Sequence, residues 1–189
     1  MRHRPTAALT PPRLATDAEE PPAWLAELAS RAGISSPPAA QYWQSPVQPH
    51  GECTVIALLH EGPEAAVRGA RVFEHAASRT LYGAWPLGRR VCGHPGIVHG
   101  GVSALILDEM FGQAYWAAFA KERGPGFTAN LSVDYKAPAP AGRWLCCTVV
   151  VVGEEGRKVR MQASLSDQPD AKGTVYATAA CLFIVARKD

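Results

Sequence analysis

The chain has 189 residues, 47% of them hydrophobic, which is enough apolar material for one folded domain with its own core. Its formal net charge is only +2 and its basic residues are scattered, so the charge pattern does not indicate a nucleic-acid partner. No apolar run reaches the roughly 18 residues of a membrane-spanning helix, so we expect no transmembrane segment.

The N-terminal residues and the cysteines bear on the compartment. The first 16 residues hold three arginines and no acid, which resembles an organelle transit peptide, although Pro5, Pro11 and Pro12 equally fit an unstructured tail. The five cysteines are odd in number and contain no CxxC pair, so we expect reduced packing residues. An intracellular, reducing compartment is therefore expected, either the mitochondrion or the cytoplasm.

Residues 1–50 are predicted to be a proline-rich, partly disordered extension with one short helix, and residues 51–189 the folded domain. The helix is predicted over 22–33 (PAWLAELASRAG), where an apolar stripe runs between a proline near the start and Gly33 past the end. Strand-like runs then follow at 53–60, 67–76 and 79–88.

The segment from Gly100 to about residue 121 is predicted to be the one long helix, because its apolar residues recur at helical spacing. It is apolar nearly all round, so we expect it to be enclosed. Beyond it, four strand-like runs at 127–138, 144–153, 158–167 and 174–186 are separated by turn-forming residues. The order predicts an α+β fold in which an antiparallel sheet, ending in a four-stranded meander, wraps around one helix.

The chemistry is expected at the start of that helix, in GHPGIVHGGVSALILDE (93–109). His99, Gly100 and Gly101 precede the helix, whose free amides and partial positive charge can stabilise an oxyanion. Asp108 follows two turns later, between the small residues Ala104 and Gly112, which leave room for a ligand or another chain. A carboxylate there could act as general base or nucleophile.

Two plainer interpretations stay open at this point. The paired glycines could simply mark the helix start, and Asp108 could be a salt-bridge partner. Glu109 competes with Asp108 for any catalytic role, because it too has apolar neighbours. The histidines and Cys92 around the helix start do not match a usual zinc spacing, so no metal is expected.

The stretch 93–109, together with TANLSVDYKAPAPAG (128–142) and EGRK (155–158), resembles the hotdog-fold acyl-CoA thioesterase superfamily. The resemblance covers about residues 65–186 and points to the thioesterase-superfamily-member and phenylacetate-type branch. It implies a hotdog fold, an antiparallel sheet wrapped around a long central helix, and a homodimer or homotetramer with the active site between subunits. Coenzyme A is then part of the substrate, and no separate cofactor is expected.

The resemblance also assigns catalytic roles. Asp108 would be general base or nucleophile, the amide of Gly100 or Gly101 would polarise the thioester carbonyl, and His99 would orient the carbonyl or the loop. Thr128 would position the hydrolytic water, opposite the partner subunit's Asp108.

Coenzyme A binding is assigned to a second group of residues. The nucleotide end of coenzyme A would contact Lys136, Arg157 and Lys158, with Asp134 and Gln162 lining the same groove. The length of the acyl chain would depend on the side chains beside Phe111, Tyr115 and Trp116. A hotdog hydroxyacyl-CoA dehydratase and a non-catalytic acyl-CoA binding protein remain the alternatives.

Overall fold

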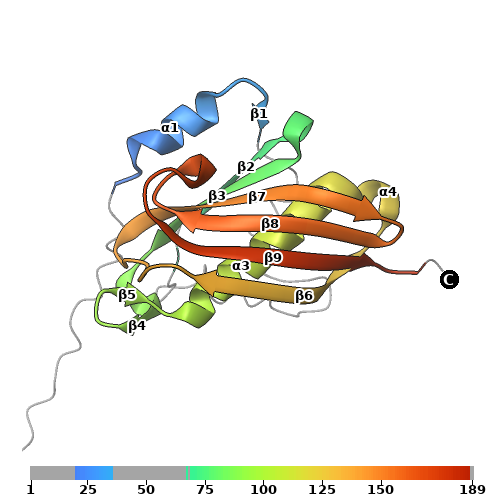
Figure 1. The fold of residues 1–189 in the computed structure, drawn as a ribbon. Coiled ribbons are helices and arrows are strands. Elements are labelled where there is room, and N and C mark those ends of the chain that lie inside the picture. The colour runs from blue at the N-terminus through green and yellow to red at the C-terminus, as the bar shows by residue number, and fades with distance from the viewer. Residues whose placement is uncertain (1–19, 36–66, 68, 188–189) are drawn as a thin grey trace, which may run out of the picture.

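A computed structural model describes residues 20–35, 67 and 69–187 of the chain (Figure 1). These residues form a seven-stranded sheet in which every neighbouring pair is antiparallel. In sheet order the strands are β1 (Ile34–Ser35), β2 (Arg71–His75), β3 (Thr80–Leu87), β7 (Arg143–Glu155), β8 (Lys158–Ser166), β9 (Val175–Val185) and β6 (Gly126–Tyr135). The strand expected over 53–60 and the arginine-rich N-terminal residues lie outside the described residues.

The helix α3 (Gly100–Tyr115) lies across one face of the sheet, and the sheet curves around it (Figure 1). Its residues Ile106, Leu107, Met110 and Phe111 have no exposed surface and form the centre of the core. The helix comes so close to the sheet that a Cβ on Gly83 of β3 would lie 2.5 Å from the Met110 sulfur. The predicted α+β hotdog fold is therefore confirmed.

The order of the strands differs from the expected four-stranded meander. β7, β8 and β9 are consecutive neighbours, but β6 pairs with β9 and forms the far edge of the sheet. β7 is already flanked by β3 and β8, so β6 does not pair with β7 and instead takes the outer side of β9. The helix delivers the chain to that edge, and residues 136–142 return it to β7.

The short helix α1 (Ala23–Ser30) confirms the helix predicted near the N-terminus and lies on the outer face of the sheet, away from α3 (Figure 1). Leu28 packs there with Tyr82 and Cys146. Arg31, just past the helix, pairs with Asp170 at 2.8 Å, and the Tyr82 hydroxyl donates to the same carboxylate at 2.9 Å. Burial and the bond to Asp170 raise the pKa of Tyr82 to about 12.

The long helix runs past α3 with a change in geometry. Trp116–Ala120 form a π-helix, η4, and Lys121–Arg123 form the last turn, α4, before Gly124 ends the helix at a positive φ of 78°. The Tyr115 hydroxyl donates to the Gly124 carbonyl at 2.8 Å and so anchors this end. π-Helical turns inside α-helices occur frequently at functional sites.

Candidate functional site

The start of α3 is capped by its own motif. The short strands β4 (Cys92–His94) and β5 (Ile97–Val98) lead into it, and His99 is the N-cap residue. The Gly101 amide donates to His99 Nδ1 at 3.0 Å. Because Nδ1 accepts this bond, the neutral ring carries its proton on Nε2, where it is a donor.

This cap distinguishes between the two glycine amides. The Gly101 amide is used by His99, whereas no acceptor for the Gly100 amide is found among the described residues. The Tyr135 hydroxyl donates to the Gly100 carbonyl at 2.8 Å, and its ring lies 3.4 Å from where a Cβ on Gly100 would be. The motif thus offers the Gly100 amide as its available backbone donor.

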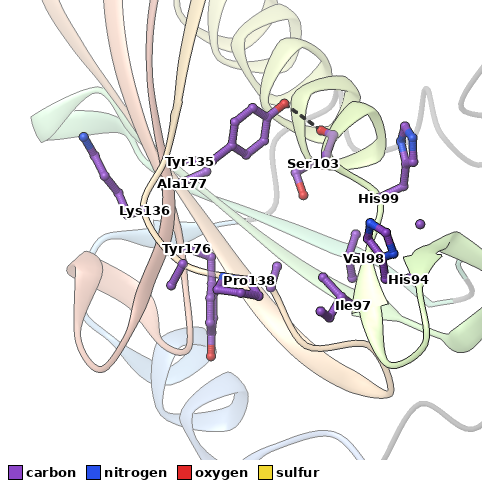
Figure 2. A pocket seen from close by; sticks show the side chains of 14 residues that line it. His94, Ile97, Val98, His99, Ser103, Tyr135, Lys136, Pro138, Tyr176 and Ala177 are labelled. Carbon is purple, nitrogen blue, oxygen red and sulfur yellow. Dashed lines mark hydrogen bonds between the residues drawn. The ribbon is translucent and has the colours of Figure 1, made fainter.

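A first cavity, of about 660 Å³, opens at this end of the helix. Figure 2 shows Tyr135 reaching the helix start across the cavity, with His94 and His99 on another side and Tyr176 below. The Tyr176 hydroxyl is fixed by a bond to Asp167 at 2.5 Å, and burial together with that bond raises the pKa of Tyr176.

A second cavity, of about 420 Å³, lies farther along α3 and contains Asp108. The Thr128 hydroxyl of the same chain donates to Asp108 Oδ1 at 2.9 Å. A β-bulge in β6 falls between Thr128 and Asn130, and bulges re-aim side chains beside functional sites. In the single chain Thr128 therefore bonds to its own Asp108, and the expectation that it faces the partner subunit's Asp108 stays a prediction.

Cys181 lies on β9 close to Asp108. Burial raises the pKa of the Cys181 thiol to about 12, and the negative charge of Asp108 adds to the shift. The thiol therefore stays protonated at neutral pH and is not a nucleophile. Glu109 lines the same cavity as Asp108, so the structure brings both candidate acids to one place.

Within one chain the two halves of the expected catalytic set stay apart. Gly100 and Asp108 are separated by eight helical residues, or about 12 Å. Each is tied to a different end of β6, Gly100 through Tyr135 and Asp108 through Thr128. The structure therefore shows two half-sites, one with the amide donor and one with the carboxylate.

The residues expected to bind coenzyme A do not form one cluster in the single chain. Lys136 lines the first cavity and pairs with Asp134 at 3.5 Å, whereas Arg157 and Lys158 lie in the β7–β8 turn, near the opposite end of β6. Arg157 donates to the Val185 carbonyl at 3.0 Å. The expectation of one shared surface therefore fails within a single chain.

Gln162 is also separate from the first cavity. It lines a shallow hollow with Thr148 and Asp170 on the outer face of the sheet. The expected groove shared by Gln162 and Asp134 is thus not formed by the residues around Lys136. Phe111, expected beside the acyl chain, is buried in the core, whereas Tyr115 and Trp116 line the second cavity.

Sequence reasoning missed Tyr135 and Tyr176 as site residues. Tyr135 lies 35 residues beyond Gly100, and only the sheet register brings the two together. A tyrosine directly before the predicted phosphate-binding Lys136 was the available signal. Tyr176 carried no such signal.

In the described part of the chain, no group of three or more histidine, cysteine, aspartate or glutamate side chains could hold a metal ion. In the same residues, no helix is long and apolar enough to cross a membrane.

Comparisons with known proteins agree with this fold and motif. The family model described as thioesterase superfamily matches residues 95–174, which include the helix start and Asp108. A rat acyl-coenzyme A thioesterase, THEM4, is 33% identical over 116 residues, 60% of this chain and 46% of the relative. A yeast protein from Saccharomyces cerevisiae, named as the uncharacterized mitochondrial membrane protein FMP10, is 28% identical over 109 residues, 58% of this chain and 45% of its own length.

A crystal structure of a thioesterase superfamily protein is 31% identical, with a TM-score of 0.52 over 61% of this chain and 53% of the other. The chain spans about half the length of the curated relatives it matches. The residues matched by the family model hold the long helix and strands β6, β7 and β8, and they include Gly100, Asp108, Thr128 and Tyr135 of the two half-sites. The matched region is therefore similar to the thioesterase superfamily, and the described residues have a hotdog fold.

Proposed function

We propose that the chain is an acyl-CoA thioesterase that hydrolyses an acyl thioester to the free acid and coenzyme A. The observation that carries the proposal is the bonded pair of Asp108 and Thr128 in the lining of a cavity with largely apolar walls. A carboxylate held by a hydroxyl beside an acyl site is a suitable general base for water. The thioesterase relatives support the same chemistry.

A homodimer would complete the site. Among the described residues β6 is an edge of the sheet and pairs with β9 alone, so its other side could receive a second copy. An antiparallel, two-fold pairing of β6 with its copy would place the Tyr135 end of one strand beside the Thr128 end of the other. The Gly100 amide of one copy would then approach the carboxylate half-site of the other, and Lys136 would approach the basic turn at Arg157.

The reaction then follows from these groups. Asp108 takes a proton from water, and the water oxygen attacks the thioester carbonyl carbon. The oxyanion that forms accepts bonds from the Gly100 amide and from His99 Nε2–H. When the intermediate collapses, the C–S bond breaks and the coenzyme A thiolate receives the proton from Asp108. Asp108 could instead attack the carbonyl itself, with water hydrolysing the resulting anhydride.

Hydrolysis of a panel of acyl-CoAs, followed by thiol release, tests the proposal. Asp108→Asn should lower kcat by about 10²-fold or more, whereas Glu122→Gln, an exposed acid in α4, should behave as wild type. A loss in Glu109→Gln in place of Asp108→Asn would transfer the role to Glu109. If the wild-type protein turned over no acyl-CoA, the proposal would be refuted. The remaining function would then be that of a protein that binds acyl-CoA without hydrolysing it.

We also propose a mitochondrial location. The arginine-rich first 16 residues and the yeast relative named as mitochondrial support it. Fractionation of cells that express the tagged full-length chain would test it, and recovery only in the cytosol would refute it.

A further inference from the structure

We infer that the second cavity holds the acyl chain of a substrate whose acyl group is a long apolar chain, and that Gly112 sets how far the chain can enter. This inference rests on the proposed function, because it names the substrate class of that same site. The cavity continues past the Asp108–Thr128 pair along the last turns of α3, so a thioester held at the pair would extend its acyl group into it.

The walls of the cavity suit an apolar chain. Beyond the carboxylate it is lined by the aromatic residues Tyr115, Trp116, Phe127 and Phe183. Trp116 is 57% exposed and Phe127 is 64% exposed, although both are large apolar side chains. An alkyl chain between them would remove this apolar surface from water, which is favourable.

The length of the cavity argues against a small acyl group. From Asp108 to Trp116 the helix advances eight residues, or about 12 Å. An acetyl group bound at the carboxylate would leave most of this length unfilled. A volume of about 420 Å³ lies in the range of pockets that enclose whole small ligands. Each methylene of a chain buried here should raise kcat/KM about fourfold.

Gly112 leaves the middle of the cavity open. A Cβ at this position would have no atom within 4 Å, so a larger side chain would project into open space without disturbing the core. Gly126, also in the lining, differs because a Cβ there would lie 2.5 Å from the Tyr115 ring. Gly112 is therefore the position at which a substitution can shorten the cavity and leave the fold intact.

The experiment compares Gly112→Leu with Gly153→Leu. Gly153 lies in β7 outside the cavity and also has open space around its Cβ, so it is a matched control. Wild type should prefer dodecanoyl-CoA to butanoyl-CoA. Gly112→Leu should lower kcat/KM for dodecanoyl-CoA roughly 10²-fold, the effect of displacing about four methylenes, and change butanoyl-CoA less than about threefold. Gly153→Leu should match wild type on both.

Binding of 1-decanol, measured by calorimetry on the same full-length proteins, separates this inference from the proposed function. Decanol carries the apolar chain without coenzyme A, and its affinity should fall in Gly112→Leu and not in Gly153→Leu. If wild type hydrolyses no acyl-CoA but decanol binding still depends on Gly112, the acyl site stands and the thioesterase proposal fails. If Gly112→Leu keeps the wild-type chain-length profile and decanol affinity, or if Gly153→Leu loses as much, the inference is wrong.

Discussion

The hydroxyl of Thr128 is the part of the candidate site whose contribution can be worked out most directly. It donates to Asp108 Oδ1 at 2.9 Å, and a hydrogen bond to a charged acceptor contributes about 1.5–3 kcal/mol. Thr128→Val removes this donor and keeps a β-branched side chain suited to a strand. If the bond orients the carboxylate in the transition state, kcat should fall about 10- to 150-fold.

Exposure decides where in that range the loss should fall. Thr128 is exposed and Asp108 half-buried in the single chain, and water weakens a bond between accessible groups, which favours about 10-fold. A loss of kcat near 100-fold would mean that the Asp108–Thr128 pair is shielded from water. A second copy of the chain paired along β6 would provide that shielding. Thr128→Val and Thr128→Ser would both be assayed by thiol release at saturating acyl-CoA. Thr128→Ser keeps the hydroxyl and should retain most of the activity. Wild-type kcat in Thr128→Val would refute the role of the hydroxyl.

Two further predictions concern hydrogen bonds that hold elements together. Tyr135→Phe removes the bond to the helix start but keeps the ring, so kcat should fall about 2- to 10-fold with KM nearly unchanged; an effect on KM alone would assign Tyr135 to substrate binding. Asp170→Asn should lower the free energy of unfolding by about 1 kcal/mol or less at pH 7, because its ion pair with Arg31 is partly exposed. Burial acts to raise the pKa of Asp170, but the bonds from Arg31 and Tyr82 outweigh it and lower the pKa. The contribution is therefore present above the ordinary pKa of about 4 and lost as pH falls through the lowered value, so urea unfolding should show the difference at pH 7 and not near pH 2; an equal difference at both would refute it.

The local elements were predictable because their signals are local. The apolar repeat from Val102 to Phe111 specified the long helix, and alternation specified the strands from 127 onward. The His99-Gly100-Gly101 motif marked the helix start, and small residues on both sides of Asp108 marked the room beside it. Each of these features depends on neighbours within two turns or one strand.

The remaining features depend on which strands pair, and no short stretch of sequence encodes that. Placing β6 beyond β9 is what brings Tyr135 to the helix start and Thr128 to Asp108 of its own chain. The same placement separates Lys136 from Arg157, which the family resemblance had grouped together. Residue chemistry identified the candidates, whereas the order of the strands decided which of them meet.

The separation of the half-sites leads to a decisive test of whether two chains share each site. Asp108→Asn and His99→Ala should each be inactive alone, because one lacks the carboxylate and the other a donor and the helix cap. If each site takes Asp108 from one chain and His99 from the other, a hybrid dimer has one site with both changes and one with neither. Random mixing puts half of the chains in hybrids, so unfolding and refolding an equal mixture should restore about a quarter of the wild-type activity. If each site lies within one chain, every site in the mixture carries a change and no activity returns, which would refute the shared site while leaving the role of Asp108 intact.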